Sequence, residues 1–358
     1  MNMKRLLALL LTIAMIVALT ACGGNSNNGD TDSTPTPGQS VTANGDIDVS
    51  KVEGTLRMTT TSLSSNGQIL GSAMCDIVNS HLPGLKNSVI ISAGSGENAF
   101  LLADKEAEMA IMTPDVSYQC LKGMDPYGKI EMYAVTKTFT NETVFAVRAD
   151  SGITSMEDLK GKTVAVGAVG SGPYELAKAV LEAGYDIWDD IEKVNLATGD
   201  SPDALRDGVV DAMVAHLSSG YPASYLSELD SGTVDVVYLG ISEDVLAKIQ
   251  STLPFEISVQ EVEGESRLNQ LKGTILCMSN TQYVAVRTDV PEDLVYAFTK
   301  TLMENAAELD SYHALGTTIR PETALSGLDP NIPIHPGAAR YYKEAGVWDD
   351  SLTVGTIH

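Results

Sequence analysis

The stretch 158–181 constrains the fold more than any other part of the chain, because it joins a strand, a glycine-rich loop and a helix start. Residues 162–166 are alternating and β-branched, which predicts a short buried strand. The loop 167–172 consists of small residues that let a backbone approach a ligand closely. Pro173 suits the first position of a helix, and residues 174–181 carry apolar residues at helical spacing. The free N–H groups and the dipole of such a helix start predict a site for a negatively charged group.

The same design occurs earlier, in residues 88–102, as a strand, a Gly-Ser-Gly loop at 94–96 and an apolar helix start. Further along, residues 203–215 predict a short helix, a turn and a strand that opens into a polar loop at 216–222. Loops at the carboxyl ends of parallel strands are where α/β proteins place ligands. The two units that combine a strand, a glycine-rich loop and a helix start, at 88–102 and 158–181, predict two lobes that direct helix starts into a shared cleft.

Composition excludes some classes of function. A chain of 358 residues is long enough for two domains of ordinary size. Its formal net charge of −24 argues against nucleic acid as a partner, because binding phosphates requires clustered Lys and Arg. The acidic residues are spread along the chain, and solubility is their simplest interpretation.

The N-terminus predicts export. Lys4 and Arg5 precede an apolar run, 6–19, that is too short for an ordinary transmembrane helix. Residues 19–22, Leu-Thr-Ala-Cys, resemble the lipobox of bacterial lipoproteins. This resemblance implies that residues 1–22 contain a signal peptide and that Cys22 is acylated after cleavage; a plain secretory signal with a chance cysteine is the alternative. Lipid chains would hold a soluble domain at the membrane surface.

Residues 23–53 are small and polar, which predicts a flexible tether, and we expect the folded part to begin near Gly54. The remaining cysteines, Cys75, Cys120 and Cys277, are odd in number, so at most one disulfide can form among them. Their spacing fits no zinc pattern, and buried small hydrophobes are the simplest interpretation. We therefore expect neither a metal nor a cofactor.

Strands that alternate with helices predict an α/β fold with mainly parallel sheets. Residues 142–150 and 282–289 share the pattern Val-Arg-x-Asp after an apolar stretch, and each is followed by a predicted helix start, at 153–159 and 290–294. Two similar strands that bracket a middle segment indicate two crossovers between lobes. The predicted first lobe is therefore 54–150, completed by 281–358 with its C-terminal helices, and the inserted second lobe is 151–280.

The order of these motifs resembles the TAXI family, the extracytoplasmic solute receptors of tripartite ATP-independent periplasmic (TRAP) transporters. The matching segments run in order along nearly all of the chain after the tether: 92–98, 106–116, 147–153, 159–172, 205–212 and 334–342. The resemblance implies a type II periplasmic-binding-protein-like fold of two lobes that captures a small organic solute, often a carboxylate, for a sodium-coupled permease. The loop 61–67 and Pro173 depart from the family pattern, so the resemblance does not identify the solute.

The candidate ligand-binding residues lie in the loops that should face the cleft, and they are Ser62, Ser65, Asn66, Ser95, Thr113, Gly170, Ser171, Gly172, Tyr174, Ser218, Ser219 and Tyr221. Ser171, with the backbone on either side of it, is the first choice for holding a carboxylate, and a tight turn is the alternative. Ser95 suits a site or a turn equally. Tyr174 suits stacking on a solute or simple packing. The choice of residues in the first loop depends on the family resemblance.

No arginine lies in any of these loops. Arg148 and Arg287 lie on the predicted crossover strands, where surface ion pairs are expected. A dicarboxylate normally requires a bidentate arginine, so a monocarboxylate or an amino acid is favoured. The histidines form no His-Glu-x-x-His pattern and no Gly-x-Ser-x-Gly elbow accompanies them, so an enzyme is not expected. His216, near the predicted cleft, is interpreted as a polar contact and His335 as structural.

These features together predict an extracytoplasmic, lipid-anchored solute-binding protein that captures a small organic acid or amino acid for a TRAP-type secondary transporter. A ligand-sensing subunit for a membrane kinase is the alternative, and an enzyme on the same fold is a third possibility.

Overall fold

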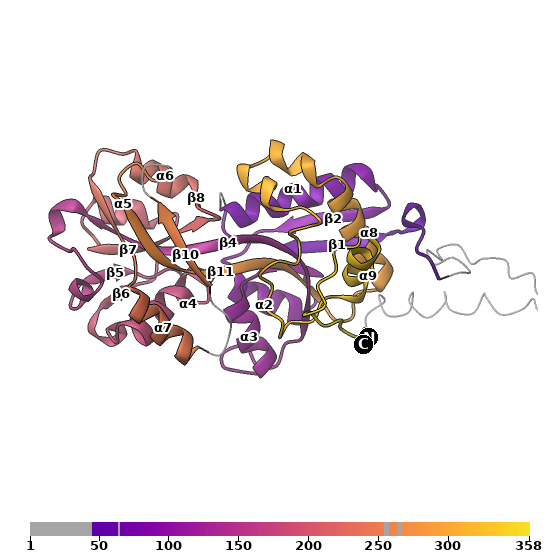
Figure 1. Ribbon diagram of the computed structural model, residues 1–358, viewed down its shortest axis with the longest axis horizontal. Helices are drawn as coiled ribbons and strands as arrows, with labels where there is room; N and C mark the ends of the chain where they lie inside the picture. The colour runs from indigo at the N-terminus through magenta and orange to yellow at the C-terminus, as the bar shows by residue number, and fades with distance from the viewer. Residues whose placement is uncertain (1–44, 64, 254–257, 264–266) are drawn as a thin grey trace, which may run out of the picture. The chain divides into compact units, whose positions relative to one another are not determined.

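The computed structural model describes residues 45–63, 65–253, 258–263 and 267–358 (Figure 1). The predicted signal peptide, Cys22 and the first part of the predicted tether lie outside the described residues. The end of that tether is ordered: a short 3-10 helix, η2 (Val49–Lys51), precedes Val52, which is buried. Ile47 and Val49 also pack against the core. The folded part therefore begins before the predicted Gly54, because these apolar side chains find a hydrophobic surface.

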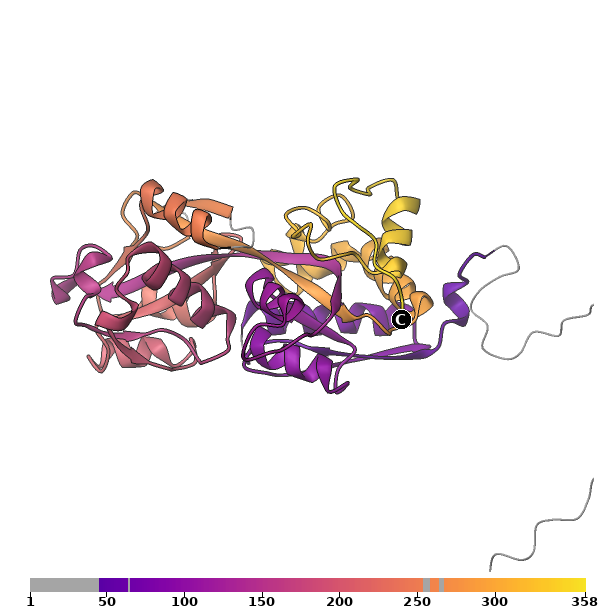
Figure 2. The same cartoon turned by 90° about the horizontal axis from the view of Figure 1, so that it is seen from below.

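Lobe I is formed by residues 45–139 and 283–358. Its first part alternates strands and helices: β1 (Gly54–Thr59), α1 (Asn66–His81), β2 (Leu85–Ile90), α2 (Ser95–Ala103), β3 (Met109–Met112) and α3 (Pro114–Lys122). The three strands are parallel, in the order β2-β1-β3. The C-terminal part adds α8 (Glu292–Glu304), the 3-10 helices η7 (Ala306–Ser311) and η8 (Ala314–Thr318), and α9 (Pro336–Glu344). This last part packs into the same hydrophobic core as the first (Figure 2).

Lobe II, residues 144–278, repeats the arrangement. Its elements are β5 (Thr163–Ala165), α4 (Gly172–Lys178), the π-helix η5 (Ala179–Gly184), β6 (Glu192–Val194), α5 (Ser201–Arg206), β7 (Ala212–Ser218), β8 (Tyr221–Pro222), α6 (Ser224–Asp230), β9 (Val236–Leu239), α7 (Glu243–Thr252) and β10 (Ser258–Glu263). Strands β6, β5 and β7 are parallel, in that order. Short 3-10 turns, η3 (Ala149–Ser151), η4 (Glu157–Leu159) and η6 (Trp188–Asp190), connect the elements.

Two long strands, β4 (Met132–Arg148) and β11 (Thr274–Arg287), join the lobes and pair with each other antiparallel. Figures 1 and 2 both show them passing side by side from one lobe to the other. In lobe I they extend the sheet beyond β3, and in lobe II β4 lies between β7 and β9. The core of lobe I ends at Phe139 and resumes at Tyr283. The first crossing therefore lies inside β4, earlier than the predicted boundary at residue 150.

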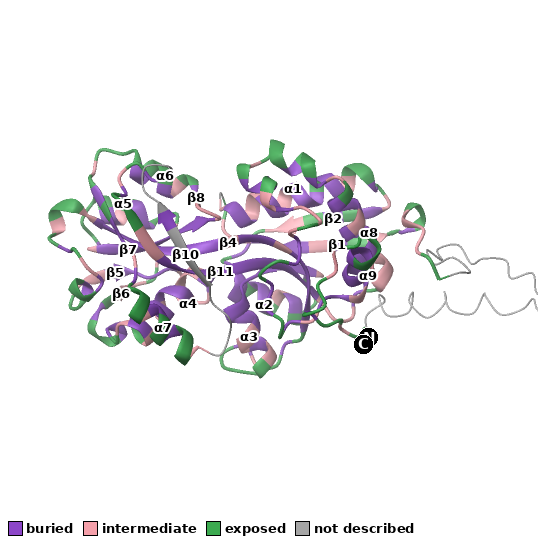
Figure 3. Ribbon diagram, in the orientation of Figure 1, coloured by how far each residue is buried: buried purple, intermediate pink, exposed green. Residues whose placement is uncertain are grey.

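The sheet of lobe II is covered on both faces, which explains its continuous apolar strands. Alternate residues of β4 point to opposite faces, so Phe145 joins one hydrophobic cluster and Val144 the other. Helices α4 and α7 cover the first face, and α5 and α6 cover the second. Figure 3 shows buried strands between helices whose outer sides are exposed.

Two predicted elements differ from the structure. The predicted helix start at 153–159 is only the 3-10 turn η4, preceded by backbone N–H groups that donate to the Asp158 carboxylate. The predicted polar loop at 216–222 is a hairpin, because Ser219 and Gly220 both adopt positive φ and let β8 pair with β7.

Candidate functional site

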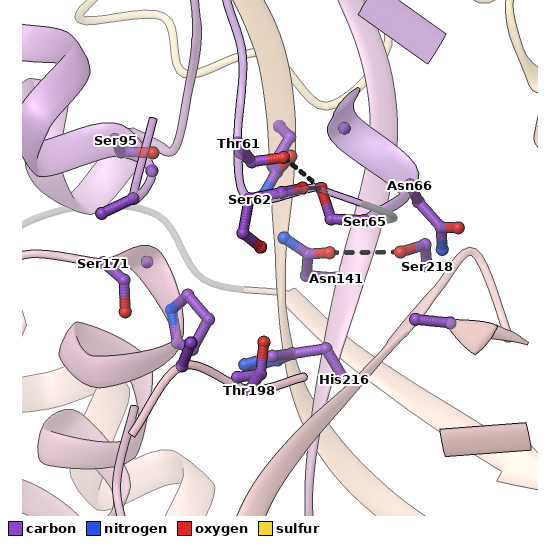
Figure 4. Close-up of a pocket in the computed structure, with 18 of the residues that line it drawn as sticks. Thr61, Ser62, Ser65, Asn66, Ser95, Asn141, Ser171, Thr198, His216 and Ser218 are labelled. Atoms are coloured by element: carbon purple, nitrogen blue, oxygen red, sulfur yellow. Dashed lines mark hydrogen bonds between the residues drawn. The ribbon is translucent and has the colours of Figure 1, made fainter. Parts of the chain in front are cut away.

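A cavity of about 120 Å³ lies where the two lobes meet at β4 and β11. Its walls come from the segments that follow β1, β2, β5 and β6, from β7, and from the loop and helix after β8. In Figure 4, Thr61, Ser62 and Ser65 of lobe I lie across the cavity from Thr198 and His216 of lobe II. The site therefore lies at the carboxyl ends of the parallel strands of both lobes, as α/β folds favour.

Seven of the predicted ligand-binding residues line this cavity, and they are Ser62, Ser65, Asn66, Ser95, Ser171, Gly172 and Ser218. Two of the serines are helix N-caps. Ser65 accepts the Gln68 N–H at 3.3 Å at the start of α1, and Ser171 accepts the Tyr174 N–H at 3.3 Å at the start of α4. Ser95 accepts the Thr113 N–H at 3.1 Å, which ties the start of α2 to the end of β3. Backbone N–H groups therefore fix the hydroxyls of Ser65, Ser95 and Ser171 before any solute is present.

Two predicted residues, Thr113 and Gly170, lie beside the cavity and not on its wall. Thr113 is fully buried and faces lobe II, where its Cγ2 would lie 3.1 Å from a Cβ at Gly172. The Gly170 carbonyl oxygen accepts the N–H of Gly96, from α2 of lobe I, at 2.8 Å. A Cβ at Gly96 would overlap that oxygen, so only glycine permits this contact. Both residues therefore lie at the contact between the lobes.

The other three predicted residues that do not line the cavity have packing roles. The Tyr174 ring meets Trp188 edge-on, with centroids 5.6 Å apart. Ser219 forms the hairpin turn, and its N–H donates to the Thr140 carbonyl at 2.8 Å. The Tyr221 ring lies 3.6 Å beneath the guanidinium of Arg267.

The predicted anion site at α4 offers few N–H groups. Pro173 has no N–H, and the Tyr174 N–H already donates to Ser171. Glu175 lies in the first turn of the helix, and burial raises the pKa of its carboxyl group. Burial, together with the nearby charge of Glu175, raises the pKa of Asp115 of lobe I to about 7. The surroundings of this helix start are thus acidic.

Sequence reasoning missed several residues of the wall, among them Phe139, Asn141, Thr198, Tyr225 and Gln282. Phe139, Asn141 and Gln282 lie on β4 and β11 where these strands cross between the lobes. The predicted crossover at 282–289 was a signal that could have found Gln282, since alternate residues of a strand at a crossing face the cleft, whereas Phe139 and Asn141 precede the predicted crossover at 142–150.

Three side chains of the wall bear buried polar atoms that no described residue hydrogen-bonds: Nδ2 of Asn66, both ring nitrogens of His216, and Oε1 of Gln282. Their exposed fractions are only 5%, 8% and 7%. Burial lowers the pKa of His216 to about 4, so its ring is neutral at physiological pH. Among the described residues that line the cavity, none is Asp, Glu, Lys or Arg.

The two arginines of the crossover strands and His335 lie outside the cavity wall. Arg148 pairs with Asp150 at 3.2 Å and Arg287 with Asp289 at 2.8 Å, which confirms the expected surface ion pairs. The His335 ring bonds backbone atoms of Val290 and Gly337, as a structural residue should.

The three described cysteines are buried. Cys75, Cys120 and Cys277 are free, buried thiols, and burial raises the pKa of each to about 12, which leaves them unreactive. Within the described ranges, no three His, Cys, Asp or Glu side chains are grouped to hold a metal ion.

No helix in the described part of the chain is long and apolar enough to cross a membrane.

Comparison with known proteins places this geometry in context. A model of the NMT1-like family matches residues 58–346. A solved structure from Bordetella bronchiseptica RB50 is 14% identical, with a TM-score of 0.50, over 84% of this chain and 91% of that one. The alkanesulfonate-binding protein SsuA from Xanthomonas axonopodis pv. citri is 13% identical over 85% of this chain and 97% of its own, with a TM-score of 0.47. The aliphatic sulphonate binding protein SsuA from Escherichia coli is 17% identical over 75% and 79%, with a TM-score of 0.45.

The predicted fold class is confirmed. The chain has the two-lobed α/β fold of type II periplasmic-binding proteins, in which each lobe contains three parallel strands and two crossover strands join the lobes.

Proposed function

We propose a function for this chain from the premise that it belongs to the NMT1-like family: it is an extracytoplasmic solute-binding protein that encloses a small solute between its lobes. The observation that carries this proposal is the cavity, which is walled by both lobes and by the two crossover strands and is lined by apolar, hydroxyl and amide side chains. A largely apolar cavity with a few polar side chains, placed between two lobes, is the kind of site in which proteins bind small molecules.

The solute class and the transporter are narrower proposals. The resemblance to the TAXI family favours a small organic acid or amino acid and a TRAP-type permease as the partner. The described side chains that line the cavity include hydroxyl and amide groups but no arginine, which suits a solute with few charges. Closure would be a hinge motion at β4 and β11, in which the solute stabilises the closed form by its preference for it.

The proposed function is tested by a thermal-shift screen of residues 45–358 against amino acids, keto acids, hydroxy acids, monocarboxylates and dicarboxylates. A molecule that binds only the folded protein must raise the melting temperature. A hit confirmed by calorimetry with one site per chain supports the proposal, whereas a folded protein that binds nothing in the panel argues against it.

The lipid anchor is a separate proposal, and it depends on Cys22. We expect the full chain, expressed in a bacterium, to fractionate with membranes and to incorporate labelled fatty acid. Cys22→Ser should abolish both, while Cys75→Ser, which alters a buried thiol, should not. Labelling that survives Cys22→Ser would contradict the anchor without affecting the solute site.

A further inference from the structure

Two acidic side chains lie at the contact between α3 of lobe I and α4 of lobe II. Asp115, in the first turn of α3, is only 1% exposed, and Glu175, in the first turn of α4, is half-buried. The side chain of Gln119, also on α3, hydrogen-bonds the Glu175 carboxyl group across the lobes. Thr113, directly before α3, packs close to Gly172 at the start of α4. The contact between the lobes therefore holds both carboxyl groups out of water and near each other.

The charged form of Asp115 is disfavoured here for two reasons. Burial removes water from the carboxylate, and the charge of Glu175 repels it; together they raise the pKa of Asp115 to about 7. Burial also raises the pKa of Glu175. Near neutral pH, a proton on this pair removes a buried negative charge that has a like charge beside it.

The other titratable groups that face Asp115 stay uncharged. These are Cys120 of α3, Tyr127 in the loop that follows α3, and Tyr283 of β11. Burial raises the pKa of all three, so none of them carries a charge near neutral pH. The side chain of Asn280, on β11, donates to the Asp115 carboxyl group at 3.2 Å. Glu175 is therefore the charge that Asp115 meets from the other lobe.

Glu175 faces two charged groups of its own lobe. Lys178 lowers the pKa of Glu175 and Glu182 raises it, and these two side chains pair with each other at 3.9 Å. Tyr127 of lobe I also faces Glu175 and is uncharged. Burial outweighs the effect of Lys178, so the pKa of Glu175 stays above that of an exposed glutamate.

Opening of the lobes would remove this burial. Rotation about β4 and β11 separates α3 from α4 and returns water to both carboxyl groups, so their pKa values fall to those of exposed side chains, about 4. The arrangement in which the lobes touch, which we call the closed form, thus binds a proton more tightly than the open form does. Linkage is reciprocal, so the proton must in turn favour the closed form.

From this geometry we propose that Asp115 and Glu175 together take up one proton from the solvent when the lobes close, so that a fall in pH favours closure and the capture of the solute. The proposal rests on the proposed solute-binding function and adds a means of regulation to it. The advantage to closure is fully present below about pH 4 and is lost as the pH rises through about 7.

His216 acts in the opposite direction at lower pH. Burial in the closed form lowers the pKa of its ring to about 4, whereas a ring exposed to water binds a proton below about pH 6.5. Opening therefore takes up a proton at His216 below that pH. The variant His216→Gln removes this opposing effect and isolates the carboxyl pair.

Single-molecule fluorescence energy transfer measures closure without any solute. Ser80→Cys in α1 and Ser227→Cys in α6 place dyes at exposed positions of the two lobes, and the buried native thiols do not react with the dyes. In the His216→Gln background, we expect the ratio of closed to open molecules to be about tenfold higher at about pH 6 than at about pH 8. An unchanged ratio overturns the proposal.

Two variants assign the effect to the pair. Asp115→Asn keeps the shape of the side chain and never ionises, so it should abolish the pH dependence and leave the closed form favoured at both pH values. Glu175→Gln removes the like charge and should weaken the pH dependence by at least about twofold. Asp104→Asn, at the exposed end of α2, is the matched control and should keep the full effect. Circular dichroism of each variant verifies that it is folded.

Glu142 is the second buried carboxyl group whose pKa is raised to about 7. Its hydrogen-bond partners, Thr140 and Gly220, lie on the crossing strand and in the hairpin of lobe II, so opening leaves them in place. Glu142→Gln should therefore keep the pH dependence of closure.

The outcomes separate this proposal from the function on which it rests. A pH dependence that survives both Asp115→Asn and Glu175→Gln, or that disappears in Glu142→Gln, overturns the proposal, because another group would then be responsible. A solute that binds to a protein whose closure ignores pH overturns the proposal but keeps the solute-binding function. Closure that responds to pH as expected, in a protein for which the thermal-shift screen yields no ligand, keeps the proton linkage and overturns that function.

Discussion

His216 illustrates how burial sets the chemistry of a single residue. The ring is surrounded by the cavity wall, and no described charged group is among the causes that shift its pKa; burial alone lowers it. A neutral ring offers one donor and one acceptor, whereas a protonated ring would offer two donors and a positive charge. The cavity wall therefore carries no positive charge at His216 at physiological pH.

The first prediction follows from that pKa of about 4. We expect the His216 ring signals in nitrogen-edited NMR spectra to remain those of a neutral imidazole from about pH 8 to about pH 5.5, although an unperturbed histidine titrates near 6.5. The variant His216→Gln identifies the signals by their loss. A midpoint near 6.5 would contradict the burial that the structure assigns to this ring.

Glu142 is a second residue whose burial has measurable consequences. It lies on β4 at the crossing between the lobes, is fully buried, and accepts hydrogen bonds from Gly220 at 2.9 Å and Thr140 at 2.7 Å. Burial raises its pKa from 4.5 to about 7. Because the pKa is higher in the folded than in the unfolded state, the stability linked to this carboxyl is fully present below about 4.5 and is lost as the pH rises through 7.

We therefore predict that Glu142→Gln is more stable than the wild type at about pH 8, by up to ~3 kcal/mol, and nearly equal to it at about pH 5. Glutamine can still accept the Gly220 N–H but never ionises. Urea unfolding at the two pH values measures the difference, and Glu228→Gln, on the exposed side of α6, is the control. Equal stability of variant and wild type at the higher pH would show that the carboxylate of Glu142 is solvated.

At the scale of elements, the two glycine loops carry the contact between lobes. The N–H of Gly96 in α2 donates to the carbonyl of Gly170 before α4, with no side chain between them. Gly94 and Thr113 of lobe I approach Ser171 and Gly172 of lobe II in the same region. One side of the cleft is thus closed by backbone.

The variant Gly96→Ala tests that contact. Alanine is favoured over glycine inside a helix by roughly 1 kcal/mol, so lobe I should remain folded. Its methyl group would overlap the Gly170 oxygen, so the lobes should rest further apart. We expect a larger radius of gyration in X-ray scattering and at least about tenfold weaker solute binding, with an unchanged circular dichroism spectrum.

Gly199→Ala is the matched control, because no atom lies within 4 Å of a Cβ at that position. If Gly96→Ala scatters and binds like this control, the contact between Gly96 and Gly170 does not govern closure.

The elements also show what sequence can predict. The loops at 94–96 and 170–172 were predicted to share a cleft, and they touch, because glycine, serine and a following helix start are a local pattern. The strand β4 was predicted from residue 142 but begins at Met132. Its first half contains Thr136 and Thr138, polar residues that are buried only because the strand passes beneath the C-terminal segment. Burial of this kind depends on distant parts of the chain.

The residues of the candidate site also differ in whether a local sequence pattern reveals them. Ser171 was predicted because a glycine-serine loop before a helix start is a local pattern, whereas Ser65 was chosen from the family resemblance; both are helix N-caps in the structure. Gln282 and Asn141 were missed because a polar residue in a strand has no local mark that separates a cavity wall from a solvent-facing edge. Tyr174 was named because it follows the glycine loop, but its ring turns to Trp188 instead.

At the scale of the whole molecule, the net charge of −24 acts on stability. Like charges on a compact chain repel one another, and salt screens this repulsion. We predict that the melting temperature rises as NaCl increases from about 0.01 M to about 0.15 M, over which the Debye length falls from ~30 Å to ~8 Å. Sucrose at equal osmolality is the control for effects that do not depend on charge. A melting temperature that stays level or falls over this salt range would show that paired charges already balance the repulsion.

The paired strands β4 and β11 give the protein a mechanical property as well (Figure 1). A ribbon of two hydrogen-bonded strands resists stretching and sliding but bends and twists readily, so it leaves the lobes few degrees of freedom. The cavity lies close to this flexure, and the outer surfaces of the lobes lie far from it. A small rotation at β4 and β11 therefore produces a larger displacement at the outer surfaces of the lobes. A membrane protein that binds the outer surfaces of both lobes can detect whether the cavity is filled from the distance between these surfaces, without contacting the solute.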